Sequence, residues 1–116
     1  MSYDLAVWDG DRPIGDRQAG SMYDEFYERY LKSNDGVVPP APRIVAYVDA
    51  LVARYPDDAD RNVVWASAPV IDEASGAIVY LLMSYGKAEE VSEYAAELAR
   101  EHGLVCFDPQ GGCLRP

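Results

Sequence analysis

Carboxylates are the side chains in this sequence whose spacing could support a specific interaction. Glutamate recurs at every fourth position over one stretch, at Glu89, Glu93, Glu97 and Glu101. Residues four apart are neighbours on a helix surface, so these carboxylates would form one ridge. Like charges at this spacing destabilise a helix by about 0.2–0.5 kcal/mol per pair. The ridge is therefore either a solvated helix face or a docking surface for a basic partner.

A second group of carboxylates consists of Asp57, Asp58, Asp60, Asp72 and Glu73. The first three of these resemble the start of a calcium-binding loop. However, loop position 12 counted from Asp57 is Ala68, where the loop requires glutamate. Carboxylates alone at the spacing of the first ridge also rarely make a selective metal site. We therefore predict no metal site and no cofactor, and we interpret these carboxylates as an acidic surface.

Residues suited to nucleophilic or acid–base chemistry are sparse, because the chain has one histidine and two cysteines. His102 falls in the last turn of a predicted helix, where a cation is favoured. No motif pairs it with Cys106. If Pro109 and Gln110 form a two-residue turn, Cys106 and Cys113 face each other across a hairpin. We predict no catalytic residues and a protein that is not an enzyme.

The chain contains nine tyrosines and two tryptophans, more than one small core needs. Most tyrosines lie on predicted helix stripes, which favours packing in the core or at its rim. Tyrosine and tryptophan are also frequent anchors of protein interfaces. The predicted partner-binding residues combine one of each with the acidic groups, and they are Asp57, Asp58, Asp60, Asp72, Glu73, Glu89, Glu93, Glu97, Trp65 and Tyr85.

The chain of 116 residues carries a formal net charge of -10, from 20 acidic and 10 basic residues. Binding to nucleic acid or to an anionic membrane is disfavoured, because the long-range electrostatic term is repulsive. The same charge accelerates association with a basic protein surface, although solubility alone would also explain it. The N-terminus lacks a signal-peptide pattern and no apolar stretch reaches transmembrane length, so we expect a cytoplasmic protein.

The elements that must position these side chains begin with the longest apolar run, residues 77–83. Its β-branched and aromatic residues and the glycines that bound it predict a strand buried on both faces. A buried helix segment would share the pattern, but the run is short for a helix. Further strands are predicted at residues 3–8, 62–66 and 104–107. Pro69 limits pairing of the second of these, which indicates an edge strand or an interruption.

Apolar residues recur at helical spacing in three segments, which predicts helices at residues 21–32, 42–55 and 88–102. Ser21 can cap the first helix, and residues 33–36 are expected to end it. Residues 14–20 are polar and poorly periodic, which predicts a loop, with or without one helical turn. Pro42 suits the first position of the second helix, and Gly103 suits the C-terminal cap of the third.

The element order β-α-α-β-β-α-β predicts a single α+β domain over residues 1–116. It is typical of a ferredoxin-like split βαβ sandwich with an antiparallel sheet and one extra helix in the first crossover. The first and third strands are central in this fold, which suits residues 77–83. Right-handed crossovers place both crossover layers on the same face of the sheet. We expect the other face to be open, or covered by loops, tails or a partner.

The tail from Gly103 to Gln110 reads GLVCFDPQ and follows an alanine- and glutamate-rich helix. Together with Pro42-Arg43-Ile44 and residues 65–76, it resembles a small uncharacterised actinobacterial protein family. The ending is similar to that of some immunity-type proteins that neutralise toxins. The resemblance implies a non-catalytic inhibitor of a basic protein toxin, and it carries over no catalytic residues.

An alternative function is a small ligand-binding or regulatory ferredoxin-like domain that forms a homodimer through its sheet. This alternative predicts a symmetric oligomer and a pocket against the open sheet face. The neighbouring genes would discriminate between the two, because a toxin-like gene favours the inhibitor and a metabolic operon favours the regulatory domain.

We predict that Cys106 and Cys113 are free thiols in protein purified under reducing, native-like conditions, because cytoplasmic thiols stay reduced. Intact-mass measurement before and after denaturing alkylation tests this, and two alkyl groups should be added. A native mass lower by two hydrogen atoms, without added oxidant, would contradict the prediction.

Overall fold

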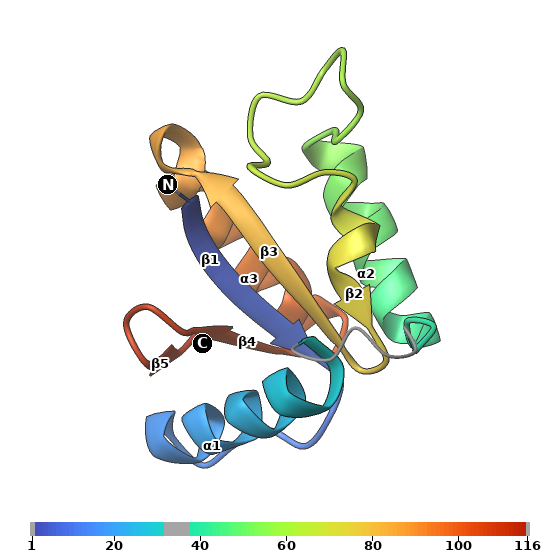
Figure 1. Ribbon diagram of the computed structural model, residues 1–116. Coiled ribbons are helices and arrows are strands. Elements are labelled where there is room, and N and C mark those ends of the chain that lie inside the picture. Colours follow the sequence, from blue (N-terminus) through green and yellow to red (C-terminus); the bar gives the residue numbers. More distant parts are fainter. Residues whose placement is uncertain (1, 32–37, 116) are drawn as a thin grey trace.

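The computed structural model describes residues 2–31 and 38–115. Its main elements are β1 (Ser2–Trp8), α1 (Asp16–Phe26), α2 (Pro42–Arg54), β2 (Ala74–Ser75), β3 (Ile78–Ser84), α3 (Ala88–Glu101), β4 (Val105–Asp108) and β5 (Cys113–Leu114). A π-helical segment, Tyr27–Leu31, continues α1, and 3-10 turns occupy Val70–Glu73 and Tyr85–Lys87. The antiparallel sheet has the order β2-β3-β1-β4-β5 (Figure 1). The predicted α+β ferredoxin-like class is confirmed.

The centre of the sheet is the antiparallel pair β1 and β3, as the sequence predicts. The two strands pair over their whole length, from Ser2 opposite Ser84 to Trp8 opposite Ile78. Successive side chains of a strand point to opposite faces, so each strand supplies both layers of the molecule. Leu5 and Val7 face one layer, whereas Ala6 and Trp8 face the other.

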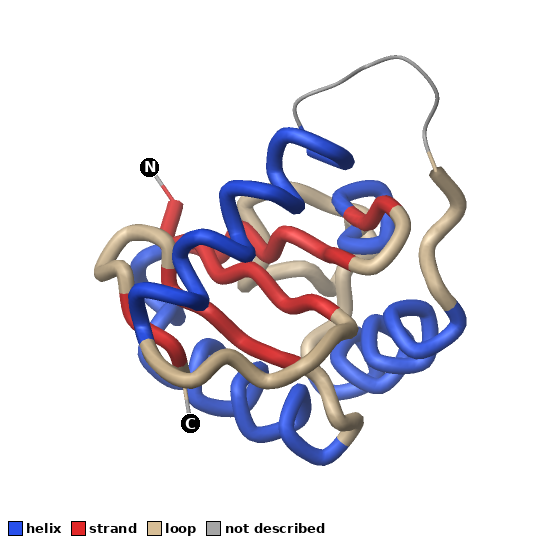
Figure 2. Tube along the Cα trace, turned by 90° about the horizontal axis from the view of Figure 1, so that it is seen from below, coloured by secondary structure: helices blue, strands red, loops and turns tan. Residues whose placement is uncertain are grey.

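The larger core lies between the sheet and the pair α2 and α3 (Figure 2). Helix α2 begins at Pro42 and ends before Pro56, as predicted. Its buried stripe consists of Ile44, Tyr47, Val48 and Leu51. The Tyr47 hydroxyl donates a hydrogen bond of 2.8 Å to the Ala95 carbonyl oxygen, which joins the two helices. Burial of this stripe is the main contribution of α2 to stability.

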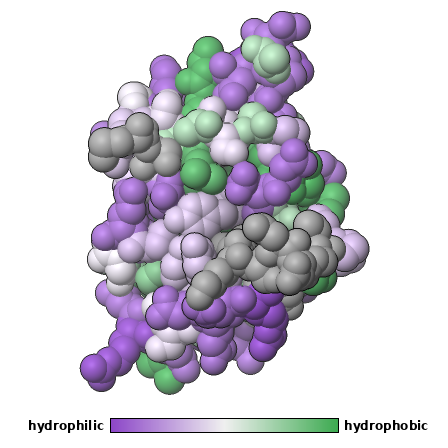
Figure 3. Space-filling model, viewed as in Figure 1, coloured by the Kyte–Doolittle hydropathy of each residue, from purple (hydrophilic) through white to green (hydrophobic). Residues whose placement is uncertain are grey.

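The opposite face of the sheet is covered in part by α1 (Figure 2). We expected this face to be open, or covered by loops, tails or a partner, and the structure corrects this because a helix of the chain itself packs there. Ala19 of α1 is fully buried there, and Phe26 packs against the Trp8 ring with centroids 5.5 Å apart. The far end of this face, around Asp4 and Leu82, is only half-buried. Hydrophobic side chains form separate patches among hydrophilic ones on the visible part of this side (Figure 3).

Helix α1 also begins earlier than predicted, at Asp16 rather than Ser21. The Ile14 N–H donates a hydrogen bond to the Gln18 side chain at 2.6 Å, which satisfies a free donor just before the helix. Contacts with the sheet outweigh the weak local periodicity of residues 14–20, which we expected to form a loop. Ser21 is therefore an exposed interior position and not a cap. The expected helix end at residues 33–36 lies outside the described residues.

The predicted strand at residues 62–66 is reduced to one bridge, Trp65 opposite Met83. The Ala66 N–H and the Val64 carbonyl complete its bonds to β3, and β2 pairs with β3 further along the same edge. Trp65 pairs with Met83 and Ala74 pairs with Val79, so the edge segment advances nine positions while β3 advances four. The extra residues of the edge segment bulge away from the ladder. The prediction that Pro69 interrupts the edge is confirmed, because proline cannot donate to the ladder.

The register of the terminal hairpin differs from the predicted one. Cys113 lies opposite Asp108 rather than Cys106, because the loop contains four residues and not two. The Asp108 carboxylate accepts the N–H groups of Gln110 and Gly111 at 2.9 and 3.0 Å, which stabilises this longer turn. Cys106 is buried and Cys113 is exposed, and both thiols are free.

The end of α3 depends on Gly103, whose φ angle is +72°. The N–H of Leu104 bonds to the Ala99 carbonyl and that of Gly103 to the Arg100 carbonyl, which together form a Schellman motif. A Cβ atom at position 103 would lie 3.5 Å from the Arg43 guanidinium, an ordinary contact. The cost of a side chain here is therefore conformational and not steric.

We predict that Gly103→Ala lowers the free energy of unfolding by about 1–2 kcal/mol, because alanine disfavours the left-handed region. Denaturant unfolding followed by circular dichroism measures the change. The matched control is Gly86→Ala, whose Cβ would meet no atom within 4 Å and whose φ is not positive. Equal stability of the two variants would show that the motif at Gly103 is not a stability determinant.

Candidate functional site

Three adjoining depressions run along the exposed side of α3. Their volumes are about 320, 480 and 290 Å³. The first two share Glu89 and Glu93, and the first and third share Glu93 and Arg115. We call this surface the α3 groove and define it by Tyr3, Tyr85, Glu89, Glu93, Glu97 and Arg115.

Helix α3 presents this ridge because its two faces have opposite chemistry. Val91, Ala95 and Leu98 are buried against the sheet and α2. The glutamates of the groove fall on the other side and are exposed, as their spacing predicts. Glu89 also lies in the first turn, where a negative charge is favoured by the helix dipole. The four predicted residues Tyr85, Glu89, Glu93 and Glu97 are thus brought together on one surface.

Two residues of the groove, Tyr3 and Arg115, were not among the predicted binding residues. Tyr3 lies on the same side of β1 as Leu5 and Val7, which faces α2 and α3. The alternation of side chains along the strand could therefore have predicted the side on which Tyr3 lies. Arg115 is placed by pairing, since its N–H bonds to the Cys106 carbonyl at 2.8 Å. Its carbonyl in turn accepts a hydrogen bond from the Arg12 guanidinium at 3.1 Å. No sequence pattern connects these distant segments.

A short hydrogen bond anchors Tyr3 in the groove. The Tyr3 hydroxyl donates to the Asp108 carboxylate at 2.5 Å, across 105 positions of sequence. Burial, followed by this hydrogen bond, raises the pKa of Tyr3 to about 12. The phenol is therefore neutral at physiological pH and acts as a fixed hydrogen-bond donor and aromatic surface.

The other predicted binding residues lie away from the groove, and several have local structural partners. The Trp65 side chain is buried, with 6% of its surface exposed, and its indole N–H donates to the Tyr55 carbonyl at 2.8 Å. The Asp57 carboxylate accepts the Val70 N–H at 2.8 Å. We therefore leave Trp65 and Asp57 out of the proposed surface.

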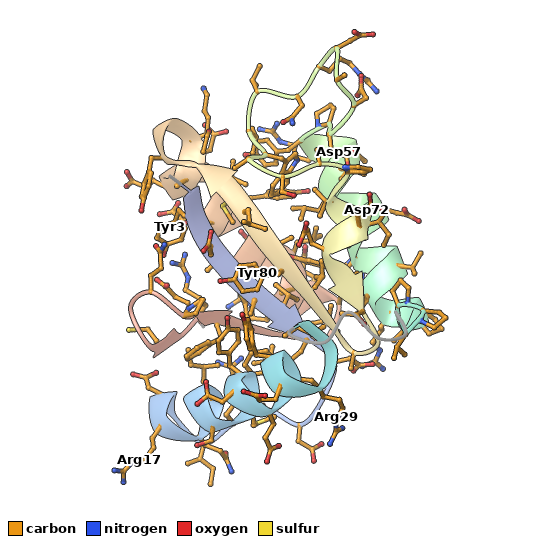
Figure 4. All side chains as sticks on the ribbon, viewed as in Figure 1. Tyr3, Arg17, Arg29, Asp57, Asp72 and Tyr80 are labelled. Carbon is orange, nitrogen blue, oxygen red and sulfur yellow. The ribbon has the colours of Figure 1, made fainter. Side chains whose placement is uncertain are left out.

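The remaining carboxylates of that second group are also distributed around the 57–73 region. Asp58 forms an ion pair of 2.9 Å with Arg61, and Glu73 accepts a hydrogen bond from the Ser67 hydroxyl at 3.0 Å. Asp60 and Asp72 are exposed. Asp57 and Asp72 lie on the α2 side of the molecule, whereas Tyr3 lies on the opposite side (Figure 4). The structure thus divides the predicted binding set into two separate surfaces.

The Cys106 thiol and the His102 ring, which could do covalent or metal chemistry, are both packed against other parts of the fold. Burial raises the pKa of the Cys106 thiol to about 12, so this thiol is protonated at neutral pH. The His102 ring packs edge-on against the Tyr47 ring, with centroids 5.9 Å apart. Within residues 2–31 and 38–115, no group of three or more histidine, cysteine or acidic side chains could hold a metal ion. The α3 groove therefore offers charge, hydrogen bonds and aromatic contact.

Comparisons with protein-family models, curated proteins and solved structures found no match to this chain. The resemblance to immunity-type proteins thus stays a prediction. Among the described helices, none has the length and apolar character needed to cross a membrane.

We predict that Tyr3→Phe lowers the free energy of unfolding at neutral pH by about 0.5–1.5 kcal/mol, because one hydrogen bond to Asp108 is lost. The pKa of Tyr3 rises from 10.0 in the unfolded chain to about 12 in the native state. A raised native pKa contributes stability that is complete below about pH 10 and is lost as pH rises through about 12. The stability difference between the wild type and the variant should therefore be constant below about pH 10 and shrink above it.

Denaturant unfolding at a series of pH values measures this difference. Tyr85→Phe is the matched control, because Tyr85 is 51% exposed and its hydroxyl has no hydrogen-bond partner among the described residues. A Tyr3→Phe protein with the stability of this control at every pH would contradict the prediction.

Proposed function

We propose that this chain is a non-catalytic binding protein that captures a partner with a basic surface along the α3 groove. The observation that supports this most is that the exposed Glu89, Glu93 and Glu97 line three adjoining depressions together with Tyr3 and Tyr85. We further propose that the partner is a basic protein toxin and that the chain acts as its immunity-type inhibitor in the cytoplasm. The tail resemblance and the net charge of -10 support this identification of the partner.

The electrostatics of the groove suit such a partner. None of Glu89, Glu93 and Glu97 forms an ion pair with another described residue. Their mutual repulsion costs α3 about 0.2–0.5 kcal/mol per neighbouring pair. Lysine or arginine side chains of a partner would remove this repulsion, and the overall negative charge would accelerate the encounter. Tyr85, with 51% of its surface exposed, supplies an aromatic anchor at the edge of the same groove.

The alternative of a regulatory domain that dimerises through its sheet remains a second proposal. Helix α1 covers part of the second sheet face, so a sheet-to-sheet dimer would have to use the half-buried end around Asp4 and Leu82. Stable homodimers usually bury a larger and more continuous apolar surface. Light scattering at a series of concentrations tests this alternative, which requires a symmetric dimer.

The test of the inhibitor proposal is a toxin encoded by a gene next to the one for this chain. The purified toxin is expected to co-elute with this protein and to lose its activity when the two are mixed. A toxin that neither co-elutes nor loses activity would overturn the proposal.

We predict that Glu93→Lys slows association with the basic partner about five- to ten-fold, because it reverses a charge at the centre of the groove. The matched control is Glu25→Lys, which makes the same change in net charge at an exposed position of α1. This control should change the rate by at most about two-fold. Surface plasmon resonance at two salt concentrations measures both variants. If the two variants slow association equally, the partner binds at a surface other than the α3 groove.

A further inference from the structure

A separate pocket of about 220 Å³ lies between the C-terminal end of α2, the loop that follows it and the start of α3. We call it the α2–α3 pocket. Its chemistry is set by Arg54, Arg61, Lys87, Glu90, Tyr55 and Val63. It shares Lys87 and Glu90 with the second depression of the α3 groove, and its other lining residues do not line that groove.

Three cationic residues line this pocket in a chain with only 10 basic residues. They come from three segments: Arg54 from the last turn of α2, Arg61 from the loop, and Lys87 from the turn before α3. Within the described residues, Arg54 and Lys87 have no ion-pair partner. Arg61 pairs with Asp58, but its side chain is 72% exposed and can bind a second acceptor. Such a concentration of positive charge is unexpected on a protein of this acidity.

Aromatic contacts hold one of these cations in place. The Arg54 guanidinium lies over the Tyr55 ring, 4.5 Å from its centroid, and 5.9 Å from that of Tyr94. The Tyr55 hydroxyl is fixed by a hydrogen bond of 2.9 Å to the Glu90 carboxylate. A guanidinium oriented in this way loses little freedom when it binds a planar acceptor such as a carboxylate.

The walls and the volume restrict the ligand. Val63, which is 74% exposed, lines the pocket together with Pro56 and Val64, so part of the wall is apolar. A volume of about 220 Å³ lies below the range of roughly 300–1,000 Å³ that drug-sized ligands need. The space suits one side chain or one small ring with its charged group.

We propose that the α2–α3 pocket binds a carboxylate attached to a small apolar or aromatic group. The carboxylate would lie between Arg54 and Lys87, and the apolar part would contact Val63. Glu90 is the opposing charge in the pocket, and it disfavours a doubly charged anion such as phosphate more than a carboxylate. The source of the carboxylate is either a free organic acid or the C-terminus of a peptide, which share this chemistry.

The test is a titration of the full chain followed by amide chemical shifts in NMR spectra. The probes are benzoate for a free acid, N-acetylphenylalanine for a chain terminus, and benzamide as the neutral isostere of benzoate. At least one carboxylate is expected to give saturable shifts at Arg61, Val64, Lys87 and Glu90, and benzamide is not. The carboxylate that binds with the higher affinity shows whether the natural ligand is a free organic acid or the C-terminus of a peptide. The proposal would be overturned if inorganic phosphate shifted these amide signals and neither carboxylate did.

Substitutions make the assignment specific. Lys87→Gln is expected to weaken carboxylate binding about two- to five-fold, as for loss of one exposed charge pair. Glu90→Gln keeps an acceptor for Tyr55 and removes the opposing charge, so it is expected to tighten binding by a similar factor. Arg17→Gln, at an exposed position of α1, is the control and should leave carboxylate binding unchanged. Absence of saturable shifts, or equal affinities in Lys87→Gln and Arg17→Gln, would overturn the proposal. This test does not involve the toxin, so its failure leaves the inhibitor proposal intact.

Discussion

The antiparallel pairing of β1 with β3 is the constraint on which the other parts of this structure depend. Its register brings Leu5 and Val7 to the core beneath α2 and α3, and Ala6 and Trp8 to the core beneath α1. A slip of one residue in either strand would exchange its two sets of side chains between faces. Each core would then lose the side chains that the slipped strand supplies to it, such as Leu5 in one core and Trp8 in the other, so the two layers specify one register together. The same register directs Tyr3 toward the α3 groove.

Helix α3 combines a stabilising inner face with an unfavourable outer one. Full burial of Val91 and near-complete burial of Leu98 each contribute about 1.5–3 kcal/mol, whereas each like-charged pair on the outer face costs about 0.2–0.5 kcal/mol. The small Ala95 and Ala99 side chains are also fully buried, which lets the helix lie close to the sheet. The helix therefore remains stable while it carries the carboxylate ridge. This difference in magnitude allows α3 to keep a charged outer face.

The residues of the tail, on which the predicted resemblance to immunity-type proteins rests, have clear roles in folding. Gly103 ends α3 in the left-handed region, and Cys106 belongs to the larger core. Val105 and Phe107 belong to the second core, and Asp108 holds both the terminal turn and Tyr3. A segment with these structural roles can recur in proteins with different functions. The proposed inhibitor function is therefore better supported by the α3 surface than by the tail.

The local pattern of the sequence determined those elements whose signal is contained within a few turns or one strand. The central strand at 77–83, the start of α2 at Pro42, the left-handed Gly103 and the ridge of glutamates on α3 are all of this kind. Each follows from periodicity, from the fixed φ of proline or from the freedom of glycine. The interruption of the edge by Pro69 belongs with them, because a missing donor is a local property.

Only the tertiary structure decided which surfaces meet. Periodicity shows that a helix has an apolar face but not which layer covers it, so the position of α1 over Trp8 was not predictable. Trp65 illustrates the same limit, since an aromatic residue in a strand pattern can lie in a core or on a surface. Tyr3 and Arg115 reach the α3 groove through pairing, and Tyr3 meets Asp108 across 105 positions of sequence. Contacts over such separations depend on the free energy of the whole packed chain, and the local sequence around either residue does not encode them.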